Sequence, residues 1–66
     1  MLEKRSFSLS GHRTSVALEP EFWAALAEAA QRQDVALSAL VTRIDTERGP
    51  DRPLASALRV FALLNG

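Results

Sequence analysis

Hydrophobic and polar positions alternate along the segment HRTSVAL, residues 12–18. A period of two, with β-branched residues in one of the two sets, is typical of a half-buried strand. The pattern therefore predicts a strand over 12–18. One side of this strand carries Thr14, Val16 and Leu18, and the other carries Arg13, Ser15 and Ala17.

The segment before this strand also alternates, but in the opposite phase. Phe7 and Leu9 share sequence parity with Arg13 and not with Val16, so one continuous strand would place them on the wrong face. Gly11 lies where the pattern breaks. It marks either a bulge or, together with Ser10, the two-residue turn of a small hairpin. Residues 4–11 are thus an N-terminal arm or an extra strand, and the pattern does not choose between them.

Three later segments show apolar residues at helical spacing. Proline suits the first turn of a helix, and Gly-Pro is a strong stop signal. No internal repeat or low-complexity segment divides the chain, so we expect a single domain over residues 1–66 that is mainly α. The expected helices cover residues 20–33, 36–48 and 53–64.

A lone strand needs a hydrogen-bonding partner, and this chain is short. A domain of 66 residues buries only about 60% of its unfolded surface, and without cysteine it has no disulfide to stabilise it. Two copies can supply each other's strand as an intersubunit antiparallel two-stranded ribbon across a two-fold axis. The expected dimer core consists of Thr14, Val16, Leu18, Phe22, Trp23, Leu26, Leu40, Val41 and Ile44.

The opposite side of such a ribbon would display Arg13, Ser15 and Ala17. A two-stranded ribbon fits the major groove of duplex DNA, where arginine reads guanine and a hydroxyl reads several base edges. A methyl group can contact thymine but cannot hydrogen-bond to a base. We therefore expect these three residues to contact bases, with readout resting mainly on Arg13 and Ser15.

The charge of the chain is neutral in sum but uneven along its length. Lys and Arg total 8, as do Asp and Glu, which counts against a simple basic nucleic-acid binder. Lys4, Arg5 and Arg13 nevertheless precede an acidic first helix. We interpret Lys4 and Arg5 as a flexible arm that contacts DNA phosphates, with His12 as a secondary phosphate contact; a solvated tail is the plainer alternative.

The blocks GHRTSVALEPEFWAAL, LSALVTRID and LASALRVF resemble a small proteobacterial subfamily of ribbon-helix-helix domains. This resemblance implies an obligate homodimer that binds duplex DNA through paired strands and acts as a transcriptional regulator on the nucleoid, in the cytoplasm. It also implies phosphate contacts from Ala36, Leu37 and Ser38, because the family anchors a phosphate at the start of its second helix. Ala36 stands where the family usually has a Ser or Thr cap, and Asp34 stands where many members have glycine.

Other classes of function find little support in the residues. There is one lysine, one histidine and no cysteine, and no Gly-rich phosphate loop is present. We therefore expect no enzymatic activity, no cofactor and no metal. No apolar run approaches the roughly 18 residues of a membrane span, so we expect no membrane partner.

The rival hypothesis is a homodimeric protein-interaction module, antitoxin-like or an adaptor, with no specific DNA site. Its partner would bind the apolar face of the third helix, which includes Val60, Leu63 and Leu64. The position of Phe7 and Leu9 discriminates between the two hypotheses. If they fold over the face that carries Arg13, DNA binding is blocked and the rival gains.

Overall fold

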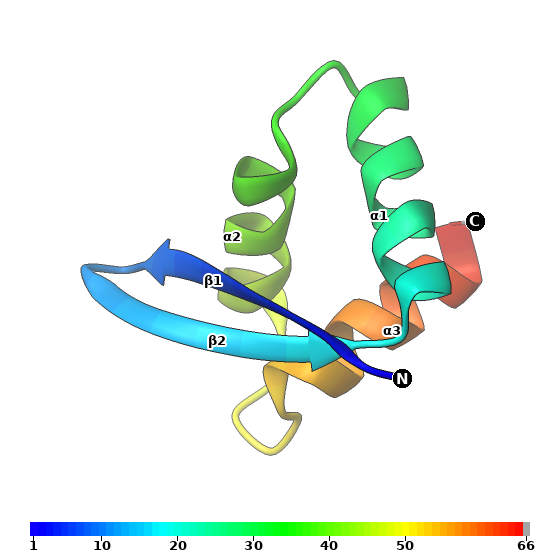
Figure 1. Cartoon of the computed structure of the whole chain (residues 1–66). Helices are drawn as coiled ribbons and strands as arrows, with labels where there is room; N and C mark the ends of the chain where they lie inside the picture. The colour runs from blue at the N-terminus through cyan, green and yellow to red at the C-terminus, as the bar shows by residue number, and fades with distance from the viewer. Residues whose placement is uncertain (66) are drawn as a thin grey trace.

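The computed structural model describes residues 1–65 and contains five elements (Figure 1). An antiparallel two-stranded sheet is followed by three helices, which confirms the predicted fold class of a mainly α domain with a short β-ribbon. The elements are β1 (Glu3–Leu9), β2 (His12–Leu18), α1 (Pro20–Arg32), α2 (Leu37–Glu47) and α3 (Leu54–Asn65).

The ribbon is a hairpin formed by β1 and β2 of the same chain. Ser10 and Gly11 make its two-residue turn, with φ of 52° and 81°. Positive φ at both central positions is what a type I′ hairpin turn requires. Pairing runs from Leu9 opposite His12 to Glu3 opposite Leu18, so the turn reverses the sequence parity between the strands. Phe7 and Leu9 therefore lie on the same face as Val16.

This pairing decides between the alternatives left open for the first segment, because residues 3–9 form a strand that pairs with β2 in a hairpin. The physical reason is that residues 3–9 alternate long enough to form a seven-residue strand once the turn closes. Lys4 and Arg5, which one alternative placed in a flexible arm, lie in this strand. β1 pairs along one edge of β2, and pairing of β2 with a second copy stays a prediction.

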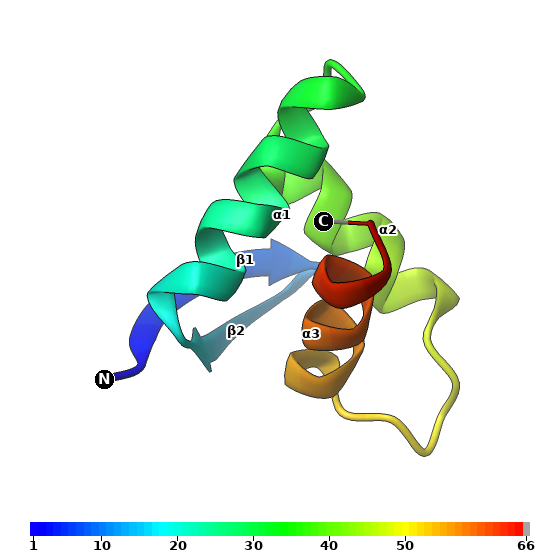
Figure 2. The ribbon, with the colours of Figure 1, turned by 90° about the vertical axis from the view of Figure 1, so that its right-hand side faces the viewer.

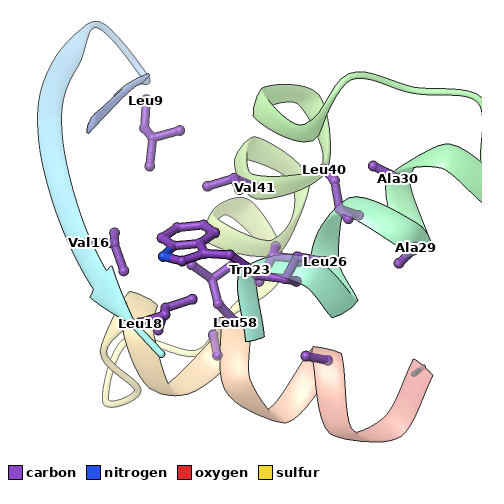
Figure 3. Packing of buried hydrophobic residues seen from close by; sticks show 13 residues of the cluster. Leu9, Val16, Leu18, Trp23, Leu26, Ala29, Ala30, Leu40, Val41 and Leu58 are labelled. Carbon is purple, nitrogen blue, oxygen red and sulfur yellow. The ribbon is translucent and has the colours of Figure 1, made fainter. Parts of the chain in front are cut away.

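The hydrophobic core forms within one chain, between the inner face of the hairpin and the three helices (Figure 3). Leu9 and Leu58, which the expected dimer core did not include, also belong to it, at 5% and 0% exposure. The expected core residues need no second copy for their burial. Buried among them are Val16, Leu18, Trp23, Leu26, Leu40, Val41 and Ile44, while Thr14 and Phe22 are half-buried.

The end of α1 sets the direction of α2. Asp34 adopts the left-handed conformation, with φ of 57°, as its tolerance for that region predicts. The N–H of Val35 donates to the carbonyl of Ala30 at 3.0 Å, and the N–H of Asp34 donates to that of Gln31 at 3.1 Å. These two bonds form the Schellman motif that commonly ends a helix. The chain can therefore turn sharply into α2.

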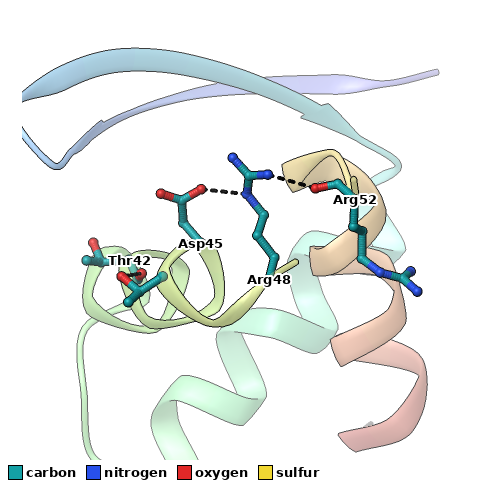
Figure 4. Close-up of polar contacts among 5 residues, drawn as sticks. Thr42, Asp45, Arg48 and Arg52 are labelled. Atoms are coloured by element: carbon teal, nitrogen blue, oxygen red, sulfur yellow. Dashed lines mark hydrogen bonds and ion pairs between the residues drawn. The ribbon is translucent and has the colours of Figure 1, made fainter. Parts of the chain in front are cut away.

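Arg48 fixes the loop between α2 and α3 (Figure 4). Its Nε donates to Oδ1 of Asp45 at 2.8 Å, and its Nη1 donates to the carbonyl of Arg52 at 2.7 Å. With this loop held, α3 runs back against α1 and lies beside the end of β2 (Figures 1 and 2).

A second polar contact joins α3 to the start of α1. The Nε of Arg59 donates to Oε1 of Glu19 at 3.2 Å, and its guanidinium lies 5.8 Å from the centre of the Phe22 ring. Glu19 is the N-cap residue of α1 but makes no side-chain capping bond. Its carboxylate is used instead to hold α3 against the first turn of α1.

Candidate nucleic-acid interface

The inner face of the hairpin is anchored by Trp23 of α1. Its indole Nε1 donates to the carbonyl of Glu3 at 2.8 Å, and its ring centre lies 5.8 Å from that of Phe7. The guanidinium of Arg5 lies 4.8 Å from the centre of the same indole and pairs with the Glu3 carboxylate at 2.6 Å. These contacts hold β1 against the helices.

The structure places Arg5 on the inner face of the hairpin. As part of an arm it was expected to contact phosphates, but it belongs to the inner set of β1 and is held by Trp23 and Glu3. The cause is the strand parity that the hairpin turn imposes, since Arg5 lies directly opposite the buried Val16. Arg5 therefore does not share a face with Lys4.

The other side of the hairpin, which we call the outer face, carries short polar side chains and two long basic ones. The two strands contribute three side chains each, paired across the ribbon. Ser6 and Ser15 form the central pair, with their hydroxyl oxygens 3.0 Å apart. The outer face consists of Lys4, Ser6 and Ser8 of β1 and Arg13, Ser15 and Ala17 of β2; Ala17 is half-buried and the others are exposed.

The outer face is positively charged although the whole chain is neutral. Lys4 and Arg13 are its charged members, and none of the six side chains is a carboxylate. Among residues 1–65, the salt bridges involve Arg5, Arg48 and Arg59, so Lys4 and Arg13 have no acidic partner there. Their charges are thus available to an anionic ligand.

Phe7 and Leu9 leave the outer face open. Both belong to the inner side, where Leu9 is 5% exposed and Phe7 packs against Trp23. The arrangement that would have blocked Arg13 and Ser15 is therefore not the one that the chain adopts.

The structure does not bring the other expected phosphate contacts to this face. His12 is exposed at the turn, belongs to the inner set, and lines a hollow with Asp45 and Arg48. The start of α2, at residues 36–38, lies beside the α1–α2 loop, above the ribbon in both views (Figures 1 and 2). Ala36 is its N-cap residue and makes no side-chain capping bond, as its methyl side chain predicts.

Ser6 and Ser8 are the outer-face residues that the sequence reasoning missed. Their orientation follows from the turn, because a two-residue connection at Ser10 and Gly11 sets the register of every pair in the hairpin. A bulge at Gly11 in place of the turn would not have paired Ser6 with Ser15 or Ser8 with Arg13. Recognising the two-residue turn in the sequence would therefore have placed Ser6 and Ser8 on the outer face.

A second surface lies between α2 and α3. Its apolar lining comes from Ile44, Ala57, Val60, Phe61 and Leu64, with charged side chains at its rim. The exposed fractions of Leu63 and Leu64 are 78% and 76%, which is high for leucine. We call this surface the apolar groove; it differs from the outer face of the hairpin in being lined mainly by apolar side chains.

Among residues 1–65, no three His, Cys, Asp or Glu side chains are grouped to hold a metal ion. Within the same range, no helix combines the length and the apolar character needed to cross a membrane.

Comparison with known sequences identifies one family. The profile of the family described as "Ribbon-helix-helix domain" matches residues 2–65, a range that includes all five elements. No curated protein and no solved structure matches the chain at a significant level.

Proposed function

Because this chain belongs to the ribbon-helix-helix family, we propose that it is a sequence-specific DNA-binding protein that acts as a transcriptional regulator. Domains of this family are generally DNA-binding regulators or antitoxins, and they are regulatory rather than enzymatic. The observation that carries the proposal is the outer face of the hairpin, which is exposed, positively charged and free of acidic side chains.

The dimensions of the hairpin suit the major groove. That groove is about 12 Å wide and admits a two-stranded ribbon. Strands of seven residues extend for roughly 23 Å at about 3.3 Å per residue. Because the inner face holds the hairpin to the helices, the outer face can enter the groove without any change in the core.

Each residue on the outer side of β2 has a proposed role toward bases. Arg13 carries the guanidinium that can donate two hydrogen bonds to guanine. Ser15 can donate to or accept from several base edges, and the methyl of Ala17 can contact the methyl of thymine. Sequence preference would therefore depend most on Arg13.

Phosphate contacts would supply much of the affinity. Lys4 lies on the outer face at the end remote from the turn, where its ammonium can reach the DNA backbone. We also propose His12 and the backbone N–H groups of residues 36–38 as contacts for DNA that extends beyond the ribbon, since a helix start favours anions. Loss of Lys4 alone should lower the slope of log affinity against log salt by about 1.

We further propose that the protein acts as a homodimer on the nucleoid in the cytoplasm. Ribbon-helix-helix domains typically form dimers and bind DNA. Since β1 is the ladder partner of β2, each copy would bring a hairpin of its own. Two linked hairpins would bind DNA more tightly than one, because the second contact is made at a high effective concentration.

Selection of bound duplexes from random DNA at near-physiological salt tests the proposal. The wild-type protein should enrich one sequence, and Arg13→Ala should relax the preference at one base position and bind that sequence roughly 5- to 150-fold more weakly. Arg43→Ala is the matched control, because Arg43 is an exposed arginine of α2 away from the outer face. No enrichment by the wild-type protein would contradict the proposal.

A second candidate function is the protein-interaction module, antitoxin-like or an adaptor, and the apolar groove favours it. Leu64 lines the groove and is exposed, and the groove could hold a partner's apolar side chains. In that case Leu64→Ser should weaken assembly, as measured by sedimentation equilibrium, while Arg13→Ala should change nothing. The two variants therefore separate the two functions.

A further inference from the structure

The two strands of the hairpin carry the same order of residue types when each is read from its N-terminus. Six residues of β1, KRSFSL from residue 4, correspond at an offset of nine to six residues of β2, RTSVAL from residue 13. On the outer face, each strand presents a long basic side chain, then a serine, then a small residue. On the inner face, Phe7 and Leu9 correspond to Val16 and Leu18, which are also apolar.

The register of the hairpin converts this likeness into an approximate symmetry. A two-fold axis that passes between two paired residues, perpendicular to an antiparallel ribbon, exchanges the two strands. With the axis between Ser6 and Ser15, Lys4 takes the place of Arg13, and Ser8 takes that of Ala17. The two cations therefore lie diagonally, at opposite ends of the outer face.

If two copies of one strand paired across a two-fold axis, they would form a symmetric ribbon. The hairpin of one chain approximates the outer face of such a ribbon. The ribbon has two members already, so a second copy is not needed to complete it. Joining two hairpins edge to edge would instead give four strands, with about 14 Å between the outermost strand axes. That distance exceeds the groove width of about 12 Å before any side chain is counted.

Building on the proposed function, we propose that a single chain inserts a complete reading ribbon, in which Ser6 and Ser8 contact bases together with Arg13 and Ser15. The six side chains of the outer face span about 13 Å along the ribbon, at about 3.3 Å per residue over four steps. At about 3.4 Å per base pair, this length covers about four base pairs. The preferred sequence of one hairpin has two unlike halves, because Arg13 reads one end and Lys4 lies at the other.

The serine hydroxyls give the first test. In the selection experiment, Ser6→Ala should relax the central base pair, and Ser8→Ala should relax the position beside the one that Arg13 reads. Each variant should bind the enriched sequence roughly 3- to 10-fold more weakly, the effect of one lost hydrogen bond. Thr46→Val is the control, because it removes an exposed hydroxyl of α2 that lies outside the ribbon.

A disulfide across the hairpin gives the second test. With a two-residue turn, the pair Leu9 and His12 exchanges ladder hydrogen bonds, so Lys4 and Ala17 form a pair without them, whose side chains lie close together. The chain has no cysteine of its own, and Lys4→Cys combined with Ala17→Cys leaves the two serines and Arg13 intact. Oxidation should give a cross-link within one chain, seen as a monomer on a denaturing gel, and the sequence preference should match that of the reduced protein.

The outcomes separate this inference from the proposed function. Loss of specific binding on oxidation with recovery on reduction would overturn it, as would a cross-link between two chains. Enrichment of a perfect inverted repeat with no effect of either serine variant would also overturn it, while leaving DNA binding by the protein intact. If the wild-type protein enriches no sequence at all, the proposed function fails and this inference fails with it.

Discussion

The two faces of the hairpin share one backbone yet meet opposite surroundings. On the inner face, Leu9, Val16 and Leu18 are 5%, 6% and 0% exposed. On the outer face, only Ala17 is even half-buried. Alternation with a period of two therefore separates the buried apolar strand residues that hold the fold from the six outer side chains that are free to contact a ligand.

This difference shows how a very small domain can support the proposed recognition surface. Contact side chains work best on a rigid support, and here Trp23 and the buried leucines hold both strands to the helices. The outer side chains contribute little to the core, so changes there should alter binding more than folding. Changes on the inner face should alter folding more than binding.

The largest expected effect is that of a charge on the inner face. Leu18 is fully buried and lies opposite Glu3, so Leu18→Asp would bury a carboxylate in the core with a second carboxylate as its cross-strand neighbour. We expect a loss of more than about 4 kcal/mol, which leaves this small domain unfolded. Circular dichroism with urea titration measures it.

The matched change on the outer face is Ser15→Asp. It should stay folded, within about 0.5 kcal/mol of the wild type, because Ser15 is exposed. Equal destabilisation of the two variants would remove the distinction between the faces.

An intermediate effect is expected for Trp23→Phe. The change removes the indole N–H that donates to the Glu3 carbonyl and leaves a smaller ring in the core. We expect a loss of about 1–3 kcal/mol, with amide hydrogen exchange rising more in β1 than in β2. Uniform faster exchange over both strands would mean that Trp23 does not anchor β1 in particular.

A smaller effect is expected at the turn. Gly11 has φ of 81° and nothing within 4 Å of an added Cβ, so the cost of Gly11→Ala comes from the backbone alone. We expect about 1 kcal/mol, measured by thermal unfolding. Gly49→Ala is the control, since Gly49 also has open space but lacks a positive φ. A neutral Gly11→Ala would argue against a tight two-residue turn.

The smallest effect concerns Glu19 and the pH. A hydrogen bond from its own backbone, joined by the Arg59 guanidinium, holds the pKa of the Glu19 carboxyl below its ordinary value and outweighs the opposing effect of burial. A lowered folded-state pKa adds stability above the unfolded pKa, which is lost as the pH falls through the folded one.

Glu19→Gln should therefore be slightly less stable than the wild type at pH 7. This gap in the free energy of unfolding should close as the pH falls below about 4, near the ordinary pKa of glutamate. Urea unfolding at both pH values measures the gap. A gap that stays constant with pH would show that this carboxylate does not contribute through its charge.

The helices and much of the core follow from local rules in the sequence. Pro20 at the start of α1 and Gly49-Pro50 after α2 place two boundaries, and the helical spacing of apolar residues identifies the buried sides. These signals act within a few residues of the feature that they specify, so one sequence suffices to read them.

The ribbon could be predicted only in part. Asparagine, aspartate and glycine are the usual first residues of a type I′ turn, and Ser10 gives no such signal for its φ of 52°. Without the turn, the phase of residues 3–9 stays undetermined, and no partner for β2 can be identified within the chain. The contact between Arg5 and Trp23 joins positions eighteen apart, beyond the reach of any local pattern.

The origin of the ribbon in two different strands of one chain has a consequence for its variation over time. In a ribbon made from two copies of one strand, every inherited change appears twice, at positions related by symmetry. Here β1 and β2 are encoded separately, so a single mutation alters Ser8 without altering Ala17. The outer face can therefore diverge one position at a time, and its two halves can acquire different chemistries while the fold beneath them stays the same.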